Sequence, residues 1–144
     1  MRFSGSKDVH YALYDSGAQV CMISQGVLSR ISKDAWHTVE GKRVQVRGYI
    51  PGQPISCAVI IMHMALGKYG EDYFEHVFCV DPRTDYKIIF GGDLAKGVGA
   101  VHDHAEGKVT LKNIPGRRNH LRLPLIPASS MKKSRVYTQH SLLP

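Results

Sequence analysis

The sequence lacks a long hydrophobic run and a cysteine framework, and both absences narrow the possible classes of protein. No apolar segment approaches the roughly 20 residues that a helix needs to cross a bilayer, and the start of the chain, residues 1–7, lacks the apolar core of a signal peptide. Cys21, Cys57 and Cys79 are widely spaced, form no C-x-x-C pair and have apolar neighbours. We therefore expect a soluble protein that is not secreted, has no membrane partner and keeps reduced core cysteines, unless a larger precursor carries a targeting signal.

Acidic residues are missing from one part of the chain. The segment from Lys112 to Arg135 holds seven of the 19 basic residues and no acid, so the remainder carries 12 basic against 12 acidic residues. The formal net charge of +7 is therefore a property of this segment. From Ile114 onward, Pro and Ser interrupt it and periodicity is weak. We predict one domain over residues 1–113 and a basic, partly disordered tail or linker over residues 114–144. That tail is either a solvated linker or a weak nucleic-acid contact.

Short apolar segments separated by turn residues predict an all-β fold. A loop followed by a strand is expected over residues 36–46, and a single helical turn over 24–31 with Ser24 as its cap. One short helix is expected to start at Asp93 and to stop at Gly97. Leu121–Ile126 could add an edge strand. The other strands are expected at residues 9–14, 20–24, 55–66, 73–80, 86–90, 100–102 and 108–111.

Pro51-Gly52 is a turn signal with strand-like residues on both sides. Proline presets one backbone angle of a tight turn and glycine accepts the positive one, so a β-hairpin is expected here. Its tip would carry Tyr49 and Ile50. An apolar tip in water is unusual, which suggests that the hairpin closes over a ligand.

Asp15 follows an apolar segment and begins the sequence Asp15-Ser16-Gly17-Ala18. Asp-Ser-Gly is ordinary turn chemistry, so Asp15 could be only a turn residue. As a catalytic group it would need a partner, since peptide hydrolysis by carboxylates uses two that share one proton at about 3 Å. The chain has one Asp-Ser-Gly. A symmetric homodimer would supply the second Asp15 on its two-fold axis.

Three motifs in order resemble the retropepsins, the aspartic proteases of retroviruses and LTR retrotransposons. The first is Leu13-Tyr14-Asp15-Ser16-Gly17-Ala18-Gln19, the second is the hairpin over residues 48–53, and the third is Ile88-Ile89-Phe90-Gly91-Gly92-Asp93-Leu94. The third looks like the family's Ile-Ile-x-Gly-x-Asp element, which packs behind the active-site loop. Residues 99–111 also look like the strand pair that follows the helix in retrotransposon members. The resemblance covers roughly residues 8–112.

The resemblance implies a closed β-barrel or sandwich with a flap hairpin, active as a homodimer. It makes Asp15 the catalytic residue, with Ser16, Gly17 and Ala18 completing the active-site loop. It also implies an extended peptide or polyprotein substrate, no cofactor and no metal. The residues that it places against substrate are Gln19, Tyr49, Ile50, Pro51, Gly52 and Ile89.

The chain departs from many viral members at Gln19 and Gly92. Those members have Asp and Arg at these positions, and the two form an ion pair beneath the active site. Both partners are absent together here, so no buried charge is left unpaired. Gln19 can still hydrogen-bond a substrate backbone. The departure predicts a weaker dimer.

Other chemistries have less support in the sequence. His102-x-His104 with Asp103 lies in an expected turn and lacks further ligands at zinc spacing. Ser16 lacks a nucleophile elbow, and the glycine pairs are too sparse for a phosphate loop.

The resemblance predicts polyprotein processing in the cytoplasm or in a virion or virus-like particle. A non-catalytic peptide-binding or dimerisation module, or an RNA-binding accessory acting through the tail, stays open.

Overall fold

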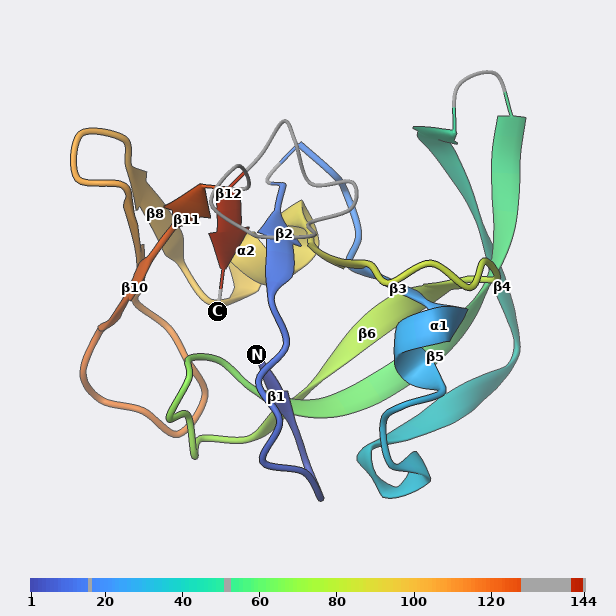
Figure 1. Cartoon of the computed structure of the whole chain (residues 1–144), viewed down its shortest axis with the longest axis horizontal. Coiled ribbons are helices and arrows are strands. Elements are labelled where there is room, and N and C mark those ends of the chain that lie inside the picture. Colours follow the sequence, from blue (N-terminus) through green and yellow to red (C-terminus); the bar gives the residue numbers. More distant parts are fainter. Residues whose placement is uncertain (16, 51–52, 128–140, 144) are drawn as a thin grey trace.

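Two β-sheets form most of the fold in this computed structural model, which describes residues 1–15, 17–50, 53–127 and 141–143. The larger sheet has the strand order β1-β5-β6-β3-β7-β2-β12-β11, and β4 also pairs with β5. Figure 1 shows the β4–β5 hairpin on the side of the molecule opposite to β8 and β10. The strands of this sheet are β1 (Arg2–Phe3), β2 (Ala12–Tyr14), β3 (Met22–Ser24), β4 (Trp36–Ile50), β5 (Gln53–Ala65), β6 (Phe74–Asp81), β7 (Ile88–Phe90), β11 (Ile126–Pro127) and β12 (Ser141–Leu143).

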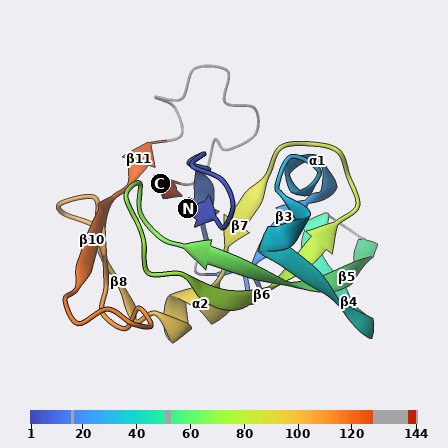
Figure 2. The same ribbon diagram turned by 90° about the horizontal axis from the view of Figure 1, so that it is seen from below.

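The smaller sheet contains the expected hairpin of β8 (Ala100–Asp103) and β9 (Lys108–Leu111), to which β10 (Leu121–Pro124) adds a third antiparallel strand. Ile114 and Leu123 are buried in the main hydrophobic core, so residues on both sides of the turn before β10 pack against the rest of the fold. Figure 2 shows β8 and β10 at one side of the molecule, next to α2 (Gly92–Gly97). The part of the expected tail over residues 128–140 lies outside the described residues.

The expected short helix is α2, and the helical turn expected within residues 24–31 is α1 (Gln25–Leu28). The described residues also contain a 3-10 turn that was not expected, η1 (Lys33–Ala35). The Ser32 side chain accepts a hydrogen bond from the backbone N–H of Asp34, which starts η1. Ser24 precedes α1, but its side chain does not cap that helix. Instead, the Ser24 hydroxyl donates to the Asp85 carbonyl at 2.5 Å and accepts from the Lys87 N–H at 3.0 Å.

The hairpin of β4 and β5 is longer than expected. Instead of a loop followed by a strand, β4 is continuous from Trp36, because Trp36, His37 and Thr38 already pair with β5. The register shifts between Thr38 and Arg43, around Gly41, whose φ of 72° is in the left-handed region that glycine adopts easily. The tip residues Pro51 and Gly52 lie outside the described residues, and Ile50 pairs with Gln53 beside them.

Strands β2 and β7 are shorter than expected, because neighbouring backbone groups bond elsewhere. The His10 N–H donates to the Met1 carbonyl at 2.8 Å, so the chain joins β2 only at Ala12. The Lys87 N–H donates to the Ser24 hydroxyl, and β7 begins at Ile88. β2 and β7 run parallel, with Leu13 opposite Ile89 and Tyr14 opposite Phe90. The two motifs that flank the candidate site are therefore adjacent strands.

The core is built on the buried faces of these strands. Phe3, Phe78 and Phe90 are at most 1% exposed, and Ile23, Ile60 and Met62 pack with them. A second cluster comprises Leu13, Met22, Cys57, Cys79 and Ile89. None of the helices in the described part of the chain has the length and apolar character of a membrane span.

Candidate active site

Asp15 is held at the end of β2 by its own backbone. Its N–H donates to the Phe90 carbonyl at 3.1 Å, which continues the β2–β7 ladder by one residue. Its carbonyl accepts from the Ala18 N–H at 3.1 Å, and its Oδ1 accepts from the Gly17 N–H at 3.1 Å. The chain therefore turns immediately after β2, and the partly exposed carboxylate is oriented by the turn itself.

Two glycines join this loop to α2. A Cβ atom on Gly91 would lie 2.3 Å from the Val20 carbonyl oxygen, so no other residue fits without moving the backbone. The Gly92 N–H donates to the Ala18 carbonyl. The Gly91 φ of −87° is ordinary, so it is close approach and not a special backbone angle that requires glycine here. The Gly91-Gly92 pair thus holds the candidate active-site loop against the start of α2.

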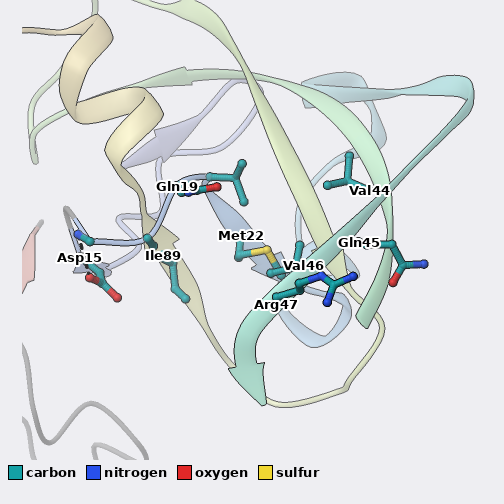
Figure 3. A pocket seen from close by; sticks show the side chains of 11 residues that line it. Asp15, Gln19, Met22, Val44, Gln45, Val46, Arg47 and Ile89 are labelled. Atoms are coloured by element: carbon teal, nitrogen blue, oxygen red, sulfur yellow. Dashed lines mark hydrogen bonds between the residues drawn. The ribbon is translucent and has the colours of Figure 1, made fainter. Parts of the chain in front are cut away.

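The loop faces an open pocket of about 730 Å³. Met22, Ile89, Val44 and Val46 give it apolar walls, and they belong to or pack on the second core cluster. Figure 3 shows Asp15 and Ile89 at one side of the pocket and Val44 and Gln45 at the other. Its remaining lining residues are Gly17, Ala18, Gln19, Val20 and Arg47.

The pocket brings together five of the residues that the sequence nominated, namely Asp15, Gly17, Ala18, Gln19 and Ile89. Ser16, Pro51 and Gly52 lie outside the described residues. Tyr49 and Ile50 belong to β4, and their side chains are likewise outside the description. The roles expected for these residues remain predictions.

Sequence reasoning missed the wall that β4 contributes. Val44 and Val46 alternate with Gln45 and Arg47, a pattern that indicated a strand but not which surface it would face. The partner of Val44 on β5 is Cys57, and this pairing places the strand beside Met22 and Ile89. The place of β4 in the sequence could have indicated that it lines the pocket, because β4 leads directly into the expected flap.

Among the described residues that line the pocket, Asp15 is the only one with a carboxylate. A partly exposed carboxylate beside an apolar pocket can orient and deprotonate a water molecule. It cannot also protonate the leaving group in the same step. The pocket of one chain therefore offers a single carboxylate among its described lining residues.

A polar cluster lies behind the loop, outside the lining of the pocket. Asp93 Oδ2 is 3.1 Å from His76 Nε2, and Asp93 Oδ1 is 3.3 Å from Cys21 Sγ. Burial opposes ionisation of Asp93, but the hydrogen bonds from His76 and Cys21 keep the pKa of its carboxyl below the usual value. Burial and the Asp93 charge raise the pKa of the Cys21 thiol. Sequence reasoning missed this cluster because its members are 72 and 17 positions apart.

All three cysteines are free and buried, as expected. Burial, aided by the nearby Cys57 and Asp93, raises the pKa of Cys79 to about 11. The thiol of Cys57 also has a raised pKa, with burial as its main cause. These thiols are protonated near neutral pH and pack as small apolar side chains.

The chain is similar in fold to a solved retroviral protease-like domain. The crystal structure of the retroviral protease-like domain of Ddi1 from Leishmania major aligns with a TM-score of 0.54 at 16% sequence identity. The alignment covers 83% of this chain and 86% of that one. No protein-family model and no curated protein sequence matches the chain. The all-β, retropepsin-like fold expected from the sequence is therefore confirmed.

Proposed function

We propose that the protein is an aspartic endopeptidase in which Asp15 and Asp15 of a second copy activate water for attack on a peptide bond. The main support for this proposal is the position of Asp15. The residue directly follows β2 in a retropepsin-like fold, and its carboxylate lines a pocket with apolar walls. One carboxylate accepts the proton of the attacking water while the other donates to the carbonyl oxygen of the substrate. No metal and no covalent intermediate take part in this mechanism.

The geometry favours an extended peptide as substrate. In the described part of the chain, β5 is the only strand that pairs with β4, so the outer edge of β4 has free backbone groups. An extended peptide could add to this edge by backbone hydrogen bonds, with its side chains alternating into and out of the pocket. Met22, Val46 and Ile89 would then favour an apolar side chain next to the scissile bond. The β4–β5 hairpin would act as the flap over the peptide.

The first test compares Asp15→Asn with Asp34→Asn. Asp34 is an exposed aspartate in η1 and does not line the pocket, so it controls for the loss of one charge. We expect the wild type and Asp34→Asn to cleave an unfolded protein with an acidic pH optimum and to be inhibited by pepstatin. Asp15→Asn should be inactive while keeping its thermal stability. Equal activity of Asp15→Asn and the wild type would refute the catalytic assignment.

A mixing experiment tests the shared site. With free exchange of subunits, a 1:1 mixture of wild type and Asp15→Asn contains about one quarter wild-type dimers, against one half of wild-type chains. Activity should therefore fall to about 25% of that of the same total amount of wild type. A value near 50% would mean that each chain works alone. Sedimentation must first show a dimer, because the chain has Gln19 and Gly92 at the positions where many retropepsins have an Asp–Arg ion pair beneath the active site.

A dimer that binds peptide but never cleaves it would instead support the non-catalytic module.

The basic segment has less support as an RNA-binding element. Two of its cations already have acidic partners, since Arg117 lies 3.6 Å from Asp72 and Arg122 lies 3.3 Å from Glu106. If it did bind RNA, affinity would fall steeply with rising salt concentration. Polyprotein processing in the cytoplasm or in a virus-like particle belongs to the same proposal and rests on the family resemblance.

A further inference from the structure

Three metal-ligating side chains from distant parts of the chain meet beside the start of α2. Cys21 precedes β3, His76 belongs to β6, and Asp93 is in the first turn of α2. One potential ligand atom from each, the sulfur, a ring nitrogen and a carboxylate oxygen, all lie within 4.8 Å of one another. The cluster is separate from the candidate active site, because none of its members lines the pocket of Asp15.

The spacing of these atoms fits a small tetrahedral ion. With zinc-to-ligand distances of about 2.0–2.3 Å, neighbouring donors in a tetrahedral site are roughly 3.3–3.7 Å apart. The cluster has separations of 3.3 Å between Cys21 Sγ and Asp93 Oδ1 and 3.1 Å between His76 Nε2 and Asp93 Oδ2. These two separations run to different oxygens of the Asp93 carboxylate, so an Asp93 that binds through one oxygen supplies one edge of the coordination tetrahedron at close to the required length. The other two separations, each at most 4.8 Å, need a small closing movement of the side chains.

The surroundings fix the donors and leave a route from solvent. Cys21 is fully buried, and its sulfur also accepts the Gly91 N–H at 3.3 Å. The Phe78 ring packs edge-on against the His76 ring, with centroids 5.9 Å apart, which restrains the imidazole. The side chains of His76 and Asp93 are 20% and 31% exposed, so water can reach the open side of the cluster. Such an arrangement provides three protein ligands and leaves a fourth position for water.

We propose that Cys21, His76 and Asp93 form a binding site for a divalent transition-metal ion of the zinc class. The mixed sulfur, nitrogen and oxygen donors favour such an ion over calcium or magnesium, which prefer oxygen ligands alone. Binding forms a metal–sulfur bond and releases the thiol proton of Cys21 to solvent. His76 binds through Nε2 after the Nε2 proton that it donates to Asp93 has moved to Nδ1 by exchange with solvent, so the ring stays neutral, and Asp93 binds as a carboxylate.

The bound ion would join three elements that meet behind the active-site loop. Cys21 directly follows Val20, which lines the pocket, and Asp93 follows the glycine pair on which the loop rests. A ligand that binds only the folded state stabilises it in proportion to the logarithm of its concentration. The site would therefore act as a structural fastener for the loop, with no part in the chemistry at Asp15.

Cobalt titration of the full chain tests the site directly, because a thiolate bound to Co²⁺ gives a charge-transfer absorption band that histidine and carboxylate ligands do not. We expect a saturable band at one ion per chain, release of one proton, and its displacement by Zn²⁺. Excess Zn²⁺ should raise the melting temperature by about 5 °C or more. The matched variants are Cys21→Ala, which should lose the band, and Cys79→Ala, which should keep it.

Two further variants keep the proposal falsifiable if Cys21→Ala fails to fold. His76→Gln changes a partly exposed residue and should weaken cobalt binding at least tenfold, whereas His104→Ala, at the exposed histidine of the His102-x-His104 pair, should leave it unchanged. The absence of a thiolate band from the folded wild-type protein would overturn the proposal, as would a band that survives in Cys21→Ala. In either case, the cluster would be only a hydrogen-bonded network. The absorption readout is independent of peptidase activity, so it succeeds or fails separately from the proposed function.

Discussion

Gly91→Ala should disrupt the packing of the candidate active-site loop against the start of α2. The added Cβ would lie 2.3 Å from the Val20 oxygen, 2.4 Å from the Val20 carbonyl carbon and 2.9 Å from the Cys21 nitrogen. Carbon–oxygen contacts ordinarily begin near 3.3 Å, so α2 and the loop must separate by about 1 Å. All three contacts are with backbone atoms, and no side-chain rotation can relieve them.

The cost follows from what this separation breaks. Overpacking in a rigid site costs about 1–3 kcal/mol. The hydrogen bonds from Gly91 to the Cys21 sulfur and from Gly92 to the Ala18 carbonyl add about 0.5–1.5 kcal/mol each when lost. Alanine also lowers the conformational entropy of the unfolded chain, which offsets about 0.4–1 kcal/mol of this loss. We therefore expect a net loss of about 3 kcal/mol in the free energy of unfolding.

Gly97→Ala is the matched control for this substitution. Gly97 is the last residue of α2, and nothing lies within 4 Å of the position that its Cβ would take. Alanine there should stabilise the protein by up to about 1 kcal/mol through helix propensity. Urea unfolding followed by the fluorescence of Trp36, the single tryptophan, measures both variants. If the two glycine variants agree within about 0.5 kcal/mol, the close approach of loop and helix is not real.

Three other substitutions test the packing and the titration of the fold. Ser24→Ala removes the partner of two partly buried backbone groups and should cost about 1–3 kcal/mol in urea unfolding, whereas Ser29→Ala, at an exposed hydroxyl, should cost under about 0.5 kcal/mol. Phe90→Ala empties a fully buried position and should cost about 3–5 kcal/mol; a loss below 1 kcal/mol would contradict its place in the core. Burial lowers the pKa of His10 below 6.5, so the unfolded chain binds its proton more tightly. Stability should therefore decrease as the pH falls below about 6.5, and less steeply in His10→Gln, when both are melted across that range; identical slopes would exclude His10 as the cause.

Local patterns were enough to predict several elements of this fold. The β8–β9 hairpin, the start of α2 and the strand before Asp15 follow from apolar segments that end at glycine or at turn residues. The order of the three motifs was enough to predict the fold class. Each of these inferences uses only neighbours in the chain, and local chemistry is strong there because tight turns accept few residue types.

Other features depended on contacts that no local pattern encodes. The 3-10 turn η1 was not predicted, because it forms within a connecting segment too short to show helical periodicity. Ser24 was expected to cap a helix, yet its hydroxyl bonds to backbone groups of Asp85 and Lys87, some 60 positions away. Strand lengths were overestimated where, as at His10, the backbone bonds to a different part of the chain.

The sequence by itself determined that Asp15 stands in a tight turn at the end of an apolar strand and that one chain offers a single such motif. Tertiary structure alone decided what surrounds it. The parallel pairing of β2 with β7 sets Ile89 beside Asp15, and the β4–β5 register brings Val44 and Val46 to the same pocket. It also gathered Cys21, His76 and Asp93 behind the loop. Strand register and the crossing of distant segments are set by the packing of the whole core, so a site assembled from them becomes visible only in the folded chain.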